Sequence, residues 1–308
     1  MWYTITQSSA SGSRPMQAIV PGIYAHSGYE GANVGCILTD AGAIVVDTPL
    51  IPAEGKAWAA EVARVSERVL FVFNTDHHRA HVIGNQYFDA PVIAHELAWK
   101  EMSNYRDAFI ERTKSIFKRQ PEIAAQFDDV VIKKPEITFT GQLIVKKGGR
   151  EVHFIRLGGH TPATSGVWLP RERILFAGDV VVVGEHPSLG QSDSKEWLEV
   201  LTRLRKMSLA AMVPGHGPLC NVEATQPVSN YIRLLRSKVR NQFLAGRSKS
   251  EAAVVISQMI DSFPYRPGDK SFVEKRIRAG VSRVYDDMKA SYAEETDHAG
   301  QPGSDTPD

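Results

Sequence analysis

In this sequence, side chains that bind metals come directly after short apolar runs, and this placement limits the folds open to the chain. Residues 69–73 read VLFVF, and Asn74 and Thr75 lead from them into DHHRAH at 76–81. A continuous apolar run of this kind is typical of a buried strand. Polar groups at the ends of such strands lie on loops that a rigid sheet holds in place. The sequence therefore predicts strands whose ends carry the chemistry.

Three further segments repeat this pattern of turn residues and ligand-type side chains after an apolar run: GGHT at 158–161, AGDVV at 177–181 and PGHGP at 214–218. With the first segment they offer seven candidate ligands, namely Asp76, His77, His78, His81, His160, Asp179 and His216. Imidazole and carboxylate are ligands that zinc, iron and manganese accept. Burying three neighbouring histidines without partners would cost desolvation energy. The set therefore predicts a metal site, with enough groups for two ions.

Strand-like and helical segments are mixed in both halves of the chain. Residues 51–66 and 194–207 have apolar side chains at helical spacing, and residues 96–127 are helical with an interruption near Pro121. Residues 137–159 read as a hairpin that turns at Gly148-Gly149. This order predicts an α/β domain with sheets inside and helices outside.

Composition excludes several classes of protein. Of 308 residues, 43% are apolar and 23% are charged, as in soluble globular proteins. The net charge of +1 provides no strong field for nucleic acid or for an anionic membrane. The sequence lacks an apolar run of about 18 residues and a signal-peptide pattern, which predicts a cytoplasmic protein without a membrane span. Two cysteines, Cys36 and Cys220, do not make a disulfide framework.

The four segments, in this order and at roughly this spacing, resemble the metallo-β-lactamase superfamily. The first motif of that family reads T-H-x-H-x-D-H, and a separate histidine, a bridging aspartate and a last histidine follow it. The chain matches this pattern at Thr75, His78, His81, His160, Asp179 and His216. The resemblance covers about residues 18–220. It implies a four-layer αββα sandwich.

The resemblance also implies two metal sites. Carried over position by position, the first site consists of Asp76, His78 and His160. The second site keeps His81 and His216, together with the bridging Asp179. Asp47, in VVDTP at a strand end, resembles the family aspartate that supports the histidine loop.

Two positions depart from the family motif. Asp76 replaces the first histidine, which adds negative charge and shifts the preference towards iron or manganese without excluding zinc. Ala80 replaces the motif aspartate, so the second site is one protein ligand short. That family aspartate also orients the attacking hydroxide. We therefore expect Asp76 to take over this role and, with Asp179, to form the catalytic pair.

Two more histidines are candidates for a place beside the ligands or the substrate. His77 is a spare imidazole within the first motif, and alternation along the chain points it away from Asp76 and His78. It is a candidate for a contact that supports a ligand. His186, seven residues after Asp179 in a GEHP loop, is a candidate for the mouth of the site.

These residues predict a metal-dependent hydrolase. The resemblance implies that a metal-bound hydroxide attacks an ester, lactone, thioester or amide of a small molecule, with one or two zinc ions as cofactor and iron or manganese as alternatives. Two other functions stay open. One is an iron-dependent oxidoreductase in the same fold, and the other is a catalytically degenerate metal-binding protein.

After about residue 220, where the resemblance ends, the apolar residues recur at helical spacing. We predict a metallo-β-lactamase-like core at 18–222, a helical extension packed on it at 223–290, and a disordered tail at 291–308. Five apolar residues in the extension are spaced three and four apart and must be buried: Val228, Ile232, Leu235, Val239 and Phe243. Their partner is either the core or a second subunit, which leaves a homodimer open.

Overall fold

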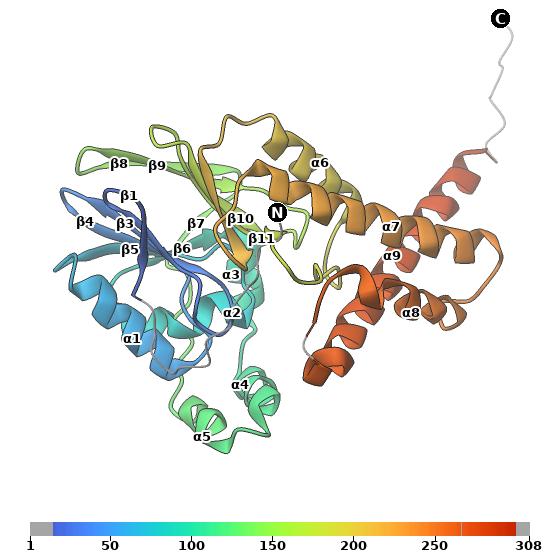
Figure 1. The fold of residues 1–308 in the computed structure, drawn as a ribbon, viewed down its shortest axis with the longest axis horizontal. Coiled ribbons are helices and arrows are strands. Elements are labelled where there is room, and N and C mark those ends of the chain that lie inside the picture. The colour runs from blue at the N-terminus through green and yellow to red at the C-terminus, as the bar shows by residue number, and fades with distance from the viewer. Residues whose placement is uncertain (1–14, 266, 300–308) are drawn as a thin grey trace, which may run out of the picture.

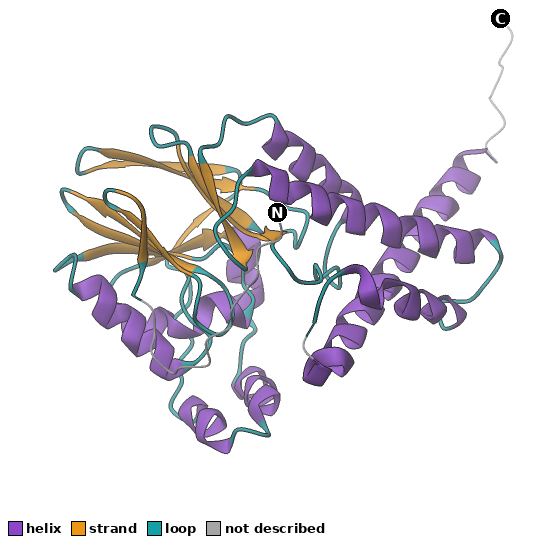
Figure 2. Ribbon diagram, in the orientation of Figure 1, coloured by secondary structure: helices purple, strands orange, loops and turns teal. Residues whose placement is uncertain are grey.

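The computed structural model describes residues 15–265 and 267–299. Two β-sheets face each other, and helices cover their outer faces (Figure 1). Figure 2 shows the strands gathered together, with helices on two sides of them and a further group of helices towards the C-terminus. The order helix, sheet, sheet, helix confirms the predicted four-layer α/β sandwich.

The first sheet has seven strands in chain order. They are β1 (Gln17–Val20), β2 (Ile23–His26), β3 (Val34–Thr39), β4 (Gly42–Val46), β5 (Val69–Phe73), β6 (Val92–His95) and β7 (Ile137–Phe139). Pairing is antiparallel from β1 to β4 and parallel from β4 to β7. Because β4 and β5 are parallel neighbours, the residues that follow them meet at one edge of the sheet.

The second sheet has the spatial order β12-β11-β10-β9-β8. Its strands are β8 (Gln142–Lys147), β9 (Arg150–Arg156), β10 (Ser165–Leu169), β11 (Ile174–Val182) and β12 (Ala211–His216). The predicted turn between β8 and β9 is confirmed, since Gly148 and Gly149 both have positive φ, as a tight hairpin turn requires. β11 and β12 are parallel, so their ends also lie together.

Apolar side chains from both sheets form the core between them. Phe73 of β5 stacks on Phe154 of β9 with ring centroids 4.5 Å apart, and Ile44 and Phe176 belong to the same buried cluster. Fully burying a side chain of this size contributes about 1.5–3 kcal/mol. This core fixes the two sheets face to face and so sets the positions of their strand ends.

Each outer face has its own helical cover. Helix α1 (Pro52–Ala63) buries Trp58 and Val62 against the first sheet. Helix α6 (Ser194–Arg205) buries Trp197 against the second, and its indole donates a hydrogen bond to the backbone oxygen of Val180 in β11 at 2.9 Å. The predicted helices 51–66 and 194–207 are thus confirmed to within a few residues at each end.

Short helices fill the connections after β5 and β6. They are α2 (Arg79–Val82), α3 (Glu96–Ser103), α4 (Asp107–Lys114) and α5 (Pro121–Ala124), with 3-10 turns η1 (Ile83–Tyr87), η2 (Ser115–Phe117) and η3 (Ala125–Phe127). The predicted helix 96–127 is therefore broken before Pro121 as well, near Tyr105. Phe109, Phe117 and Phe127 form a small core there.

The C-terminal part is helical, as predicted. It contains α7 (Thr225–Leu244), α8 (Val255–Met259) and α9 (Lys270–Ala299), with 3-10 turns η4 (Val222–Ala224), η5 (Glu251–Val254), η6 (Ile260–Ser262) and η7 (Pro267–Asp269). Four residues of the predicted apolar stripe are fully buried: Val228, Ile232, Leu235 and Val239. They share one core with α6 and β11. Phe243, the fifth, is half-buried at the edge of the Tyr285 ring.

The ends of the extension differ from the sequence-based boundaries. Helix α9 continues to Ala299, beyond residue 290, and residues 300–308 of the predicted tail lie outside the described residues. The division into core and extension stays a prediction. No helix in the described part is long and apolar enough to cross a membrane. The cytoplasmic location and the homodimer likewise stay predictions.

Candidate metal centre

Loops and strand ends from both sheets meet at one site. His78 follows β5, His81 lies in α2, and His160 lies between β9 and β10. Asp179 lies within β11, and His216 ends β12. With Asp76, these predicted ligands form two groups whose ligating atoms lie within 4.8 Å of one another: Asp76, His78 and His160, and His81, Asp179 and His216. We call these groups the first and the second cluster.

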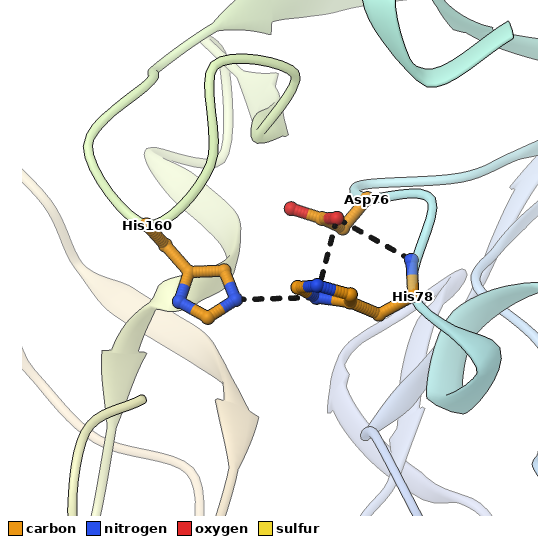
Figure 3. Close-up of side chains that lie close together, drawn as sticks. All are labelled: Asp76, His78 and His160. Carbon is orange, nitrogen blue, oxygen red and sulfur yellow. Dashed lines mark hydrogen bonds and ion pairs between the residues drawn. The ribbon is translucent and has the colours of Figure 1, made fainter. Parts of the chain in front are cut away.

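Side-chain spacing in the first cluster suits a shared ion. His78 Nδ1 lies 3.4 Å from Asp76 Oδ1 and 3.3 Å from His160 Nε2 (Figure 3). Two ligands bound by one tetrahedral ion at 2.0–2.2 Å lie roughly 3.3–3.6 Å apart. Asp76 and His160 are buried, whereas the His78 side chain is 31% exposed. The cluster therefore has one side open to a ligand from solvent.

Asp76 is held from both oxygens. Its Oδ2 accepts hydrogen bonds from the hydroxyls of Thr161, at 2.9 Å, and Thr164, at 2.6 Å. Its Oδ1 accepts the backbone N–H of His77 at 2.7 Å. These neighbours outside the cluster thus leave one orientation for this carboxylate, in which Oδ1 faces His78.

The second cluster is arranged around Asp179. Asp179 Oδ2 lies 3.5 Å from His81 Nε2, and Asp179 Oδ1 lies 3.3 Å from His216 Nε2. Asp179 Oδ2 also lies 3.4 Å from His160 Nε2, which joins this cluster to the first. His81 Nε2 and Asp179 Oδ1 are buried and form no hydrogen bond with the described residues. An unpaired buried polar atom costs about 1–3 kcal/mol, and a cation between these atoms would offset that cost.

Asp47 supports the second cluster from behind. Its Oδ1 accepts the backbone N–H of Thr75 at 2.7 Å, and its Oδ2 accepts the Thr75 hydroxyl at 2.6 Å. Asp47 Oδ2 also lies 3.0 Å from His81 Nδ1, so the opposite ring nitrogen faces Asp179. Asp47 has φ 56°, in the left-handed region that residues other than glycine adopt infrequently. This uncommon conformation occurs at the residue that positions His81.

Asp179 was expected at a strand end, but it lies inside β11 at an irregularity in the pairing with β12. Two glycines make this possible. Gly178 has φ 53°, and a Cβ there would come within 2.9 Å of Thr75. A Cβ on Gly215 would lie 2.0 Å from Asp179 Oδ1. A side chain at either glycine would displace Asp179 or the Thr75 loop.

The electrostatics of the two clusters differ. Burial alone would raise the pKa of Asp76 and Asp179, but neighbouring imidazoles outweigh it and hold the pKa of both carboxyls well below the ordinary range. Burial lowers the pKa of His160 to about 4, despite the nearby carboxylates. For His81, burial is outweighed by Asp47 and Asp179, which raise its pKa well above the ordinary value. The buried carboxylates therefore make the site favourable for positive charge.

The two remaining candidate histidines lie in different surroundings. His77 is buried beside Asp76, with Nδ1 3.0 Å from Asp76 Oδ1, and it belongs to neither cluster. His186 was expected at the mouth of the site. Its Nδ1 instead lies 3.2 Å from the Tyr231 hydroxyl and its Nε2 3.1 Å from the backbone oxygen of Ile260. Both ring nitrogens of His186 are thus engaged by the C-terminal helices, because the loop folds back onto them.

Sequence reasoning missed several neighbours of the clusters. Thr161 and Thr164 follow His160 closely, so the spacing HTPAT was a usable signal. Gln191 Oε1 lies 2.5 Å from His78 Nε2, and Glu185 Oε1 lies 3.9 Å from His216 Nδ1. Neither Gln191 nor Glu185 has a distinguishing motif. Their positions depend on how the loop between β11 and α6 folds.

The residues present fit a bound metal ion. Imidazole nitrogens and carboxylate oxygens form both donor sets, and their spacing matches ligands of one ion. The second cluster has no carboxylate from position 80. The Ala80 methyl lies against Gly31, where an added Cβ would be 3.4 Å away.

The chain is similar in sequence to a curated relative and in fold to several solved structures. A relative from Caenorhabditis elegans, named β-lactamase-like protein 2 homolog, is 23% identical over 241 residues, which cover 77% of this chain and 73% of the relative. A metallo-β-lactamase family protein from Thermus thermophilus superposes with a TM-score of 0.63 and 18% identity, covering 88% of this chain and 95% of that one.

A second similar structure covers a larger share of this chain. The stereoselective inverting sec-alkylsulfatase of Pseudomonas sp. superposes with a TM-score of 0.67 and 14% identity over 96% of this chain, which spans 52% of the alkylsulfatase. At this identity the likeness concerns the fold alone. The model of the metallo-β-lactamase superfamily matches residues 28–216, a range that contains both clusters. The chain therefore belongs to the metallo-β-lactamase superfamily.

Proposed function

We propose that this protein is a metal-dependent hydrolase that cleaves an ester, lactone, thioester or amide of a small molecule. Membership of a generally hydrolytic superfamily supports the reaction class. The two clusters supply the ligands, Asp76, His78 and His160 in one and His81, Asp179 and His216 in the other. A bound divalent ion supplies two things there, a water of lowered pKa and polarisation of the substrate carbonyl.

The position of Asp179 is the observation that carries this proposal. Its two oxygens lie 3.3–3.5 Å from His81, His160 and His216, which belong to both clusters. A buried carboxylate among three imidazoles is costly unless it is paired with positive charge. We therefore assign Asp179 the bridging role and place the reacting atoms beside it.

The two proposed catalytic carboxylates have separate tasks. Asp179 holds the two ligand clusters in register. Asp76 Oδ1, fixed by its neighbours, is the acceptor that orients the attacking water, because Ala80 has no acceptor to offer. The hydroxyls of Thr161 and Thr164 donate to Asp76 Oδ2, so this second oxygen does not compete with Oδ1 for the water. His77 and Asp47 act on the ligands and not on the substrate.

Zinc is the proposed metal, since imidazole-rich sets with one carboxylate suit it. The carboxylate in each cluster also suits iron and manganese. Elemental analysis of purified protein separates the candidates. Zinc favours the hydrolase, and iron with a visible absorption band favours an oxidoreductase. The absence of stoichiometric metal favours a degenerate binding protein.

The activity test uses a panel of carboxyl esters, lactones, thioesters, amides and, because of the alkylsulfatase fold, sulfate esters. Asp76→Asn keeps the shape of the side chain but removes its charge. We expect it to weaken metal binding by about 10-fold or more and to lower turnover, because a neutral amide oxygen is a weaker ligand than a carboxylate and even an outer partner is worth about 10–100-fold. Equal metal affinity in wild type and Asp76→Asn would remove Asp76 from the ligand set.

A further inference from the structure

His78 is the most exposed imidazole of the two clusters, and its ring is held by a residue outside them. His78 Nε2 lies 2.5 Å from Gln191 Oε1. The other ring nitrogen, Nδ1, faces the remaining members of the first cluster, 3.4 Å from Asp76 Oδ1 and 3.3 Å from His160 Nε2. Gln191 and the cluster therefore contact opposite sides of the same ring.

The chemistry of the amide oxygen fixes the tautomer of that ring. A carbonyl oxygen only accepts hydrogen bonds, so His78 Nε2 must carry the proton that Gln191 accepts. A neutral imidazole has one N–H, which leaves a lone pair on Nδ1. Asp47 acts on His81 by the same logic with the nitrogens exchanged, since it holds Nδ1 and leaves Nε2 towards the cluster.

We propose that Gln191 is a positioning residue that holds His78 in the Nε2–H tautomer and thereby turns the Nδ1 lone pair towards Asp76 and His160. This inference rests on the proposed role of His78 as a metal ligand. Without Gln191, the carboxylate oxygen Asp76 Oδ1, 3.4 Å from His78 Nδ1, is a competing acceptor, and it would draw the proton to Nδ1, where the proton blocks metal binding.

The loop that carries Gln191 is anchored to both neighbours of the site. The backbone N–H of Asp193 donates to the backbone oxygen of Gly159, next to His160, at 3.0 Å. The Asp193 side chain caps α6 by accepting the N–H groups of Lys195 and Glu196. The loop position relative to His160 is thus set by backbone bonds, which gives Gln191 a fixed base.

The C-terminal helix α9 supports the same loop from the other side. A Cβ on Gly190 would lie 3.2 Å from Ala279, and a Cβ on Gly280 would lie 3.1 Å from Leu189. Close packing of this kind leaves the loop little freedom to move away. The extension therefore reaches the metal site through the residue next to Gln191.

Nitrogen-15 NMR of the histidine rings in the full chain tests the tautomer directly, before and after zinc is added. We expect Nε2–H for His78 in wild type and in Gln191→Glu, which keeps an acceptor. In Gln191→Met, which has similar length and no amide acceptor, the proton should move to Nδ1 in the zinc-free protein. The matched control is Gln142→Met, because Gln142 and His153 form another exposed pair, 3.0 Å apart, away from the clusters.

Zinc affinity provides the second readout. Gln191→Met should lower the zinc affinity of the first cluster by about 10-fold. This is the lower end of the roughly 10–100-fold range for an outer partner, because Gln191 is exposed. Gln191→Glu should stay within about 3-fold of wild type, and Gln142→Met should not change. Nδ1–H in wild type would overturn the inference, and so would an Nε2–H tautomer that persists in zinc-free Gln191→Met. If wild type bound no zinc, the proposed function would fail, while the ring spectra would still decide the role of Gln191.

Discussion

The first and second clusters have equal numbers of ligands but differ in how the surrounding structure treats their departures from the family motif. At Asp76, the aspartate that replaces histidine is buried and bonded to two threonine hydroxyls. At Ala80, the missing carboxylate has no substitute among the described ligand groups, and Gly31 packs against the methyl. The first cluster therefore has a replacement for the family ligand that it lacks, and the second cluster has none.

Support for the imidazoles also differs between the clusters. His81 is fully buried, and a buried carboxylate, Asp47, holds it. His78 is partly exposed, and a neutral amide holds it. A carboxylate partner raises the basicity of the imidazole more than an amide does. The comparison teaches that the second cluster, which has no replacement for its missing ligand, holds its retained His81 with a buried carboxylate, whereas the first cluster holds His78 with an exposed amide.

Removing one histidine from each cluster should have the largest effect. We expect His160→Ala to lower the zinc affinity of the first cluster, and His216→Ala that of the second, by about 100-fold or more. Removing an outer partner costs about 10–100-fold in metal affinity, and removing a direct ligand should cost more. Zinc titration against a chromophoric chelator measures both. His153→Ala, in β9 and outside the clusters, is the control. If either variant lost both ions equally, the two clusters would be one cooperative site.

Asp47→Asn should act on the second cluster alone. The amide N–H₂ cannot accept from His81 Nδ1, so the imidazole would turn its proton towards Asp179. We expect affinity at the second cluster to fall by about 10–100-fold, with the first cluster changed by less than about 2-fold. Titration of both sites decides this, with the exposed Asp89→Asn as the control. Equal losses at both clusters would show that Asp47 holds the whole loop and not one ligand.

Ala80→Asp should reduce the difference between the clusters. The added carboxylate supplies a ligand and negative charge, so we expect the second cluster to bind zinc about 10-fold more tightly, by analogy with the scale of outer-partner effects. Ala80→Leu, which adds bulk without a ligand, controls for displacement of Gly31. Calorimetry of wild type should show two unequal sites that converge in Ala80→Asp. Two equally tight sites in wild type would mean that another residue already replaces the missing aspartate.

Substitution of Glu54, which contacts the loop beside Ala80, should have the smallest effect, a pH-dependent change in the free energy of unfolding. Glu54 Oε2 accepts the backbone N–H of Glu30, next to Gly31, and burial raises the Glu54 pKa to about 7. Because this pKa is higher in the folded state, the stabilising contribution is complete below the ordinary glutamate pKa and is lost as pH rises through about 7.

The side chain that Glu54→Gln introduces stays neutral at every pH. The Glu54→Gln protein should therefore become more stable than wild type as the pH rises through about 7. The side chain is partly exposed, which limits the gain to less than about 1 kcal/mol. Thermal unfolding between pH 4 and pH 8 measures it, with exposed Glu122→Gln as the control. A difference between Glu54→Gln and wild type that does not vary with pH would remove titration as the cause.

The sequence by itself determined the layered α/β fold and the residues that meet at the site. Apolar runs followed by histidine or aspartate have few solutions, because buried strands must pair and parallel strands bring their ends to one edge. Six of the seven candidate ligands fall into the two clusters, and these six are the ones that the resemblance implied; His77 belongs to neither cluster. The hairpin at Gly148-Gly149 was predictable for a local reason, since its turn requires positive φ.

Only the tertiary structure decided what surrounds those ligands. Gln191 and Glu185 reach the clusters because the loop after β11 packs on α9, and His186 turns away because the same packing offers it Tyr231. Asp179 lies within a strand because Gly215 permits the close approach. These contacts join residues far apart in the chain. Packing between distant elements sets them, whereas the ligand pattern is written in local runs of residues.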